Sequence, residues 1–278
     1  MKKKPLLGIM LSAFLFCTAY SQQLKTPQPS PTAEIKQNFG LSQIEISYSR
    51  PGIKGRKIFG DLVPYGNIWR TGANAATTIT FGDDVTIGDK KIPAGKYGLL
   101  TIPGENEWTV IITKQTDVTS PAAYKQDQDV VRVPAKPFQL PFSIETFTIG
   151  LGDITSDSCK LELMWDNVYV HVPITTDVDS KVMSQIKEIM GGDNHPYFQA
   201  ALYYIEKGKD LNQAVTWLDK AIQQDPKGFY IYYQKARALA KLGKKEDALA
   251  ASNKSIELAK AAKNDDYVAL NEKLQKDL

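Results

Sequence analysis

The chain has 278 residues, of which 42% are hydrophobic and 23% charged, and this composition is typical of a folded globular protein and excludes a disordered or collagen-like chain. The formal net charge is +3, and Lys2, Lys3 and Lys4 account for all of it. The rest of the chain is neutral, which excludes a general nucleic-acid-binding surface because such surfaces need an excess of Lys and Arg.

Residues 1–21 have the layout of a secretory signal peptide. The basic residues Lys2–Lys4 precede the apolar stretch Pro5–Phe16, and small residues stand before the predicted cleavage site at Gln22. The apolar stretch is too short to cross a bilayer comfortably. We therefore expect an exported protein that is periplasmic, extracellular or associated with the outer membrane, with no integral membrane segment after cleavage.

Residues 22–32 are polar and contain three prolines, which predicts a linker. Residues 33–176 then contain many short strand-like runs. Apolar residues occupy every second position in Ile44–Tyr48, Cys159–Trp165 and Val168–Val172, so one face of each strand is expected in a core. Further runs, separated by turns rich in Gly and Pro, are Thr77–Phe81, Lys96–Ile102, Trp108–Thr113, Val130–Val133 and Phe142–Ile149. This pattern predicts an antiparallel β-sandwich or a related open barrel.

Helical patterning takes over after this domain, which makes the chain an α+β protein of two domains. Residues 177–193 carry Val178, Val182, Ile186 and Ile189 at helical spacing and end in a Gly pair, which predicts a connector helix.

Residues 194–278 contain an internal repeat. Ala214 and Ala248 are 34 residues apart, as are Ala221 and Ser255, and this period matches the tetratricopeptide repeat, a pair of packed helices. The sequence predicts two such repeats and a capping helix. Two repeats are fewer than usually fold alone, so we expect them to pack on the β-domain or on the connector helix.

The repeats also suggest a surface for an unknown protein partner. Tyr204, Tyr232 and Tyr233 are aromatic residues on the predicted helices, and concave repeat surfaces bind partner segments with such side chains. The alternative is that these tyrosines pack the helices against one another.

The densest patterning lies between Tyr48 and Asn74. Five bases and one acid, Asp61, stand between residues 46 and 82. Guanidinium groups near aromatic rings suit a ligand with negative charge, such as an acidic glycan or peptide. The candidate surface comprises Arg50, Lys54, Arg56, Asp61, Tyr65, Trp69, Arg70 and Asn74. In the alternative, structural interpretation, these arginines bond loop carbonyls and Trp69 fills the core.

The sequence offers no catalytic constellation. Asp61 has no second carboxylate, His or nucleophile at a diagnostic spacing, and no nucleophile elbow, phosphate-binding loop or dinucleotide-binding motif occurs. A chain with two His and one Cys after signal cleavage is not expected to hold a metal or another cofactor. The rival hypothesis is a carbohydrate-active envelope enzyme that uses Asp61 in a cleft near Trp69.

The same segment carries a resemblance to a known family. RPGIKGRKIFGDLVPYGNIWRTGANAATTITF, continued by IPAGKYGLLTIPGENEWTVI, resembles the bacterial envelope family of unknown function numbered 2911 over roughly residues 33–175. A tetratricopeptide-like tail is a familiar companion of this domain. The resemblance implies a secreted β-rich module of unassigned activity and assigns no catalytic residues. The leading expectation is therefore a non-enzymatic envelope protein that combines a binding or assembly module with a protein-interaction tail.

Overall fold

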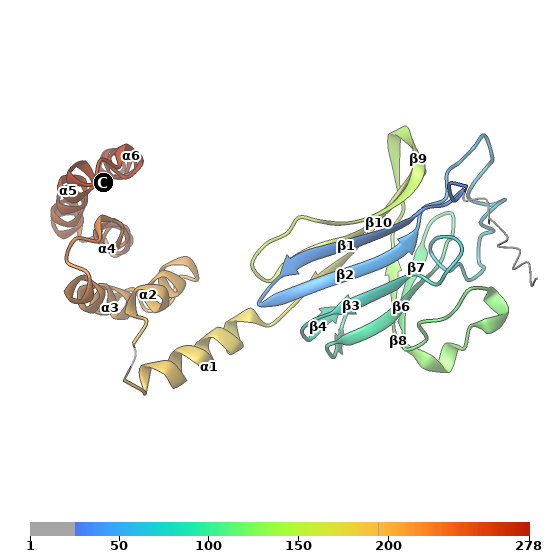
Figure 1. Cartoon of the computed structure of the whole chain (residues 1–278), viewed down its shortest axis with the longest axis horizontal. Coiled ribbons are helices and arrows are strands. Elements are labelled where there is room, and N and C mark those ends of the chain that lie inside the picture. Colours follow the sequence, from blue (N-terminus) through green and yellow to red (C-terminus); the bar gives the residue numbers. More distant parts are fainter. Residues whose placement is uncertain (1–25, 194) are drawn as a thin grey trace, which may run out of the picture. The chain divides into compact units, whose positions relative to one another are not determined.

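The computed structural model describes residues 26–193 and 195–278, so the predicted signal peptide 1–21 and residues 22–25 of the predicted linker are outside the described part. The chain divides after Thr176 into two compact units, the second of which begins at Asp177. The first unit contains the strands and the second contains the α-helices (Figure 1).

Six antiparallel strands form the larger sheet of the first unit, in the order β1-β2-β3-β6-β7-β8. Their bounds are β1 Thr32–Phe39, β2 Ser42–Ser49, β3 Thr78–Phe81, β6 Gly95–Ile102, β7 Trp108–Thr113 and β8 Asp129–Ala135. Between β7 and β8 lie two short 3-10 helices, η1 Pro121–Ala123 and η2 Gln126–Gln128.

Four antiparallel strands form the second sheet, in the order β5-β4-β10-β9. They are β4 Val85–Ile87, β5 Lys90–Ile92, β9 Phe138–Gly152 and β10 Ser158–Thr175. β10 contains an irregularity at Asp166, which has a φ of 51° and interrupts the register with β9. Such a bulge bends a strand without ending its pairing.

The core lies between the inner faces of the two sheets. Along β10, Cys159, Leu161, Leu163 and Trp165 are buried and alternate with partly exposed residues, as the period of two of a strand requires. At one end of the core, Trp69 stacks on Trp165 with ring centroids 5.8 Å apart, and Phe59 meets Trp108 edge to face at 5.0 Å. These aromatic residues join the loop before β3 to both sheets.

The predicted fold class is confirmed: the first unit has two antiparallel sheets and is not a closed barrel. Three strands were not expected from the sequence. β1 buries only Phe39 completely, so it shows little apolar patterning, and β4 and β5 have three residues each. The two runs Cys159–Trp165 and Val168–Val172 form one strand, because pairing with β9 continues past the bulge.

The second unit contains six α-helices, in agreement with the predicted fold class. They are α1 Val178–Met190, α2 Tyr197–Glu206, α3 Leu211–Gln224, α4 Phe229–Lys241, α5 Lys245–Ala261 and α6 Asp265–Lys276. No helix within residues 26–193 or 195–278 combines the length and the apolar character that a membrane span requires.

Small buried residues allow these helices to approach closely. Ala201 of α2, Ala214 of α3, Ala236 of α4 and Ala248 of α5 are all completely buried. The starts of α1, α3 and α6 are capped by side chains. At α3, the Asp210 carboxylate accepts hydrogen bonds from the N–H groups of Asn212 and Gln213. The α2–α3 and α4–α5 hairpins are therefore built as packed helix pairs.

Candidate functional site

The segment between β2 and β3 is a loop that is bridged to β6 of the larger sheet at Trp69. The Trp69 N–H donates to the carbonyl of Thr101 at 2.7 Å, and the Thr101 N–H donates to the carbonyl of Trp69 at 3.0 Å. Thr71, with a φ of 55°, follows this bridge and accepts a hydrogen bond at its carbonyl from the Thr77 hydroxyl at 2.8 Å. The bridge and the buried threonines fix the direction of the side chains at residues 68–70.

Arg50 and Arg56 have their guanidinium groups bound to protein oxygens. Arg50 Nε donates to the carbonyl of Phe147 at 3.1 Å, and its Nη2 donates to Thr148 Oγ1 at 2.8 Å, which links the end of β2 to β9. Arg56 donates to the carbonyls of Gly52 at 2.6 Å and Ile53 at 3.0 Å within its own loop. The guanidinium groups of Arg50 and Arg56 thus bond different parts of the protein, Arg50 to β9 and Arg56 to its own loop.

Lys54 and Asn74 contact the chain that enters β1. Lys54 Nζ donates to the carbonyl of Pro29 at 3.2 Å, and Asn74 Nδ2 donates to the carbonyl of Ser30 at 3.0 Å. Both residues have positive φ angles, of 50° and 55°. Their side chains therefore tie the start of the domain to the loop.

Asp61 and Tyr65 are exposed on the same loop. Tyr65 packs over Gly60, where a Cβ atom would lie 2.9 Å from the Tyr65 ring, so glycine is needed at that position. The Asp61 carboxylate forms no hydrogen bond or ion pair with any residue in the described part of the chain. General acid-base catalysis needs a second group within hydrogen-bond reach of the reacting atoms, and the surroundings of Asp61 supply no support for the enzyme hypothesis.

Trp69 and Arg70 line a cavity of about 520 Å³. Because side chains alternate along extended backbone, Trp69 packs into the core while Arg70 lies on the opposite side, where its Nη1 donates to the carbonyl of Thr119 at 2.5 Å. The wall also includes Leu62, Val63, Pro64, Gly66, Asn67, Ile68, Ser120 and Pro121. Of the eight predicted residues, the structure brings these two together at a cavity.

The three tyrosines of the predicted partner surface lie in different places. Tyr204 contacts Trp217 edge to face at 4.7 Å, and Tyr233 contacts Tyr267 at 5.6 Å. Tyr232 lines a separate depression between α3, α4 and α5. Tyr233 thus takes part in helix packing, while Tyr204 lines the groove described in the next paragraph.

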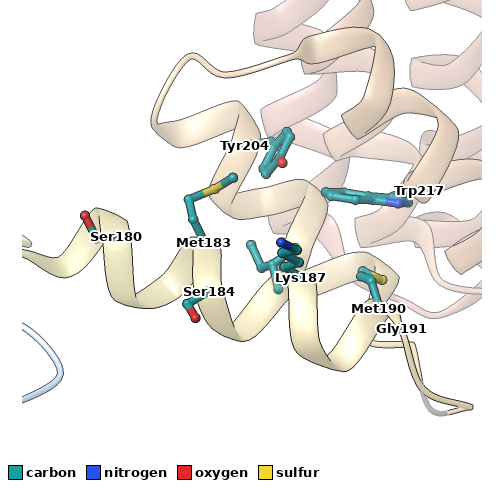
Figure 2. Close-up of a pocket in the computed structure, with 9 residues that line it drawn as sticks. Ser180, Met183, Ser184, Lys187, Met190, Gly191, Tyr204 and Trp217 are labelled. Atoms are coloured by element: carbon teal, nitrogen blue, oxygen red, sulfur yellow. The ribbon is translucent and has the colours of Figure 1, made fainter.

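An apolar groove of about 750 Å³ lies between α1 and the first helix hairpin. Figure 2 shows Met183, Lys187 and Met190 on the side of α1 that faces Tyr204 and Trp217. The remaining residues of its wall are Ser180, Ser184, Ile186 and Gly191. Of the residues that line the groove, Tyr204 was expected from the sequence to lie on a partner surface, whereas Met183, Met190 and Trp217 were not. The spacing of Met183, Ile186 and Met190, three and four residues apart, was the available signal for this helix face.

Asp179 fixes the start of α1 to the hairpin. Its Oδ1 accepts a hydrogen bond from the Tyr203 hydroxyl at 2.8 Å, and its Oδ2 accepts one from Lys209 Nζ at 2.9 Å. The hydrogen bond from Lys209, followed by that from Tyr203, lowers the pKa of the Asp179 carboxyl below its usual value of 3.8. The ion pair between Asp179 and Lys209 therefore helps to hold α1, which forms one wall of the groove, against the α2–α3 hairpin.

Among the residues that the structure describes, no three His, Cys, Asp or Glu side chains gather as metal binding would require. Cys159 is buried in β10, and burial raises the pKa of its thiol to about 11. A thiol of this kind is protonated and inaccessible at neutral pH.

Comparison with known families agrees with this architecture. Residues 30–174 match the family described as protein of unknown function (DUF2911), and residues 217–250, within α3 to α5, match the tetratricopeptide repeat. No curated protein and no solved structure matches the chain. The predicted resemblance and the predicted repeat-like tail are both confirmed. Because the first match covers more than half of the sequence, the chain belongs to the DUF2911 family of proteins of unknown function.

Proposed function

We propose that this protein is exported and non-enzymatic, and that its helical unit binds a protein partner in the groove between α1 and the α2–α3 hairpin. The observation that carries the proposal is the apolar groove itself, where Met183 and Met190 face the half-buried rings of Tyr204 and Trp217. The layout of residues 1–21 motivates export to the cell envelope.

The construction of helical repeats explains why this surface is open. In a stack of helix hairpins, each pair covers the apolar face of its neighbour. Here a single helix, α1, precedes the first hairpin, and a groove is left along its contact with Tyr204 and Trp217. An additional helix or extended segment from a partner would fill this space.

The groove residues also suggest the chemistry of the partner. Methionine side chains adapt to differently shaped apolar surfaces, and aromatic residues are frequent anchors of protein interfaces. Lys187 lies in the groove wall and forms no ion pair with another residue in the described ranges. We therefore propose a partner segment that has apolar side chains and an acidic residue beside Lys187.

A non-enzymatic role is favoured by the surroundings of the sequence candidates. Arg50 and Arg56 bond protein oxygens, and Asp61 stands exposed without a titratable partner among the described residues. No specific observation favours the carbohydrate-active alternative over partner binding.

Position-specific photocrosslinking tests the proposal in cells that produce the protein. A benzoylphenylalanine residue is placed at Lys187, in the groove, and in a matched protein at Lys260, an exposed lysine of α5. The proposal predicts a discrete protein adduct from position 187 that disappears in the Trp217→Ala variant. Adducts of equal amount and size from both positions, or an adduct unaffected by Trp217→Ala, would argue against the groove as the binding site.

A further inference from the structure

Arg70 differs from the other arginines of its loop in the use of its hydrogen-bond donors. Its Nη1 donates to the carbonyl of Thr119, but its Nε is enclosed and has no acceptor in the part of the chain that the structure describes. A guanidinium carries five N–H donors in a planar fork. Arg50 and Arg56, by contrast, each use two nitrogens to bond protein oxygens.

Arg70 stands in the wall of the 520 Å³ cavity, and its Nη2 forms no hydrogen bond with any residue that the structure describes. The rest of that wall is largely apolar. Leu62, Val63 and Pro64 contribute from one turn, and Ile68, Trp69 and Pro121 from the neighbouring backbone. Sites for small molecules typically have volumes of about 300 to 1,000 Å³ and combine apolar walls with a few placed polar groups. The cavity has both properties.

The backbone around Arg70 is held firmly in position. Trp69 is bonded in both directions to Thr101, and the Thr71 hydroxyl lies 3.1 Å from that of Thr101. Thr71 has a φ of 55° and is completely buried. Backbone in such a sparsely populated conformation persists only when its surroundings determine it, and it is often found at binding sites.

Charge complementarity indicates the ligand. Between residues 46 and 82 the single acid is Asp61, against five bases, and Asp61 does not line the cavity. The planar donors of a guanidinium match the two oxygens of a carboxylate. An apolar body would occupy the space beside Leu62 and Ile68 while its carboxylate meets Arg70.

We propose that this cavity binds a small organic carboxylate with an apolar body, and that Arg70 receives its charged end. This site lies in the β-domain and is independent of the groove proposed to bind a protein partner. A peptide C-terminus offers the same chemistry, but the loops that surround the cavity and its volume favour a small molecule.

The test compares two probes that differ in charge, 3-phenylpropanoate and 3-phenylpropanamide. Binding to the isotopically labelled protein is followed through the backbone amide signals of Gly66, Asn67 and Ile68, which line the cavity. A charge-assisted hydrogen bond contributes enough for the carboxylate to bind roughly tenfold more tightly than the amide. Equal affinity for the two probes, or no shift with either, would overturn the proposal.

Variants assign the preference to Arg70. Arg70→Gln should abolish the difference between acid and amide, whereas the control Arg56→Gln, whose residue is outside the cavity wall, should retain it. Leu62→Glu places a negative charge at the exposed cavity rim without removing Arg70, and it should also weaken binding of the acid. Leu62→Glu keeps the test decisive if Arg70→Gln fails to fold, because retained acid preference in it would contradict the proposed site.

A third probe separates the two sources of the carboxylate. The peptide acetyl-Ala-Ala-Phe with a free C-terminus is compared with 3-phenylpropanoate under the same conditions. Arg70-dependent binding of 3-phenylpropanoate supports the small-molecule proposal. Arg70-dependent binding of the peptide alone would overturn it in favour of a peptide terminus.

Discussion

Asp179 accepts a hydrogen bond from the Tyr203 hydroxyl at 2.8 Å, across the junction between α1 and α2. The same carboxylate pairs with Lys209. The Asp179 carboxylate thus attaches the wall of the groove that carries Met183 and Met190 to the wall that carries Tyr204 and Trp217.

Asp179→Ala is predicted to loosen α1 from the hairpin. Both hydrogen bonds to the carboxylate are lost, so Trp217, the sole tryptophan after residue 176, should become more exposed to water. The measurement is the fluorescence emission maximum of Trp217 in a protein whose three other tryptophans are replaced by Phe. A shift of several nanometres to longer wavelength is expected. The control is Asp219→Ala, which removes the partner of Lys235 outside the groove wall and should leave the emission unchanged.

Acid is predicted to have the same effect as this substitution. The pKa of Asp179 is lowered, chiefly by the hydrogen bond from Lys209, from a usual value of 3.8. Because the pKa of Asp179 is lower in the folded than in the unfolded protein, its ionised carboxylate stabilises the folded state fully above pH 3.8. This stabilisation is lost as the pH falls through the pKa of Asp179 in the folded protein. Trp217 emission in the wild type should therefore be constant down to about pH 4 and shift below it, whereas Asp179→Ala should lack this step.

Asn271 is predicted to be the most sensitive polar residue of the helical unit. It is completely buried, its Nδ2 donates to Ser255 Oγ at 2.8 Å and to the Tyr267 carbonyl at 2.7 Å, and its Oδ1 accepts from Ser252 Oγ at 2.9 Å. Asn271→Ala should cost about 2–3 kcal/mol of unfolding free energy, because buried bonds are lost and a space is left. Urea unfolding followed by circular dichroism measures the loss. Asn253→Ala, on the exposed surface of α5, should change the free energy by less than about 0.5 kcal/mol.

The Cys159 thiol is predicted to be unreactive in the folded protein. Burial raises its pKa to about 11 and also blocks access, and the reactive thiolate is scarce at neutral pH. In a Cys17→Ser background, labelling by a thiol reagent at pH 7 should be at least about a hundredfold slower than in urea-unfolded protein, because it requires transient opening of the strand. Comparable labelling rates in the two states would show that β10 is not packed as described.

The strands of the β-domain were predictable where burial left an alternating pattern. Trp108–Thr113 was expected as a strand with the same bounds as β7. β1 was not, because it pairs along one edge of the sheet and its side chains stay mostly outside the core, so its main contribution is backbone hydrogen bonding. A residue pattern reports burial, and it carries little information on a strand that is held by its backbone.

The site residues were harder to predict because their closeness in sequence does not fix where their side chains point. Arg50 and Arg70 lie in the same loop, but Arg50 donates a hydrogen bond to β9, whereas Arg70 donates one to the segment before η1. In α1 the apolar spacing predicted a helix correctly, whereas Ile189 of that pattern is 43% exposed and Met190 lines the groove. Only the packing of α1 on the hairpin distinguishes these neighbouring residues.

Binding of a protein partner in the groove can be tested by photocrosslinking from position 187. We expect an adduct of defined mass from a protein that carries benzoylphenylalanine at Lys187 and no such adduct from the matched Lys260 position. The adduct should be lost in Trp217→Ala and Asp179→Ala proteins that remain folded by circular dichroism. An adduct that persists in the folded Trp217→Ala protein, or one formed equally at position 260, would contradict the assignment of this groove as the partner site.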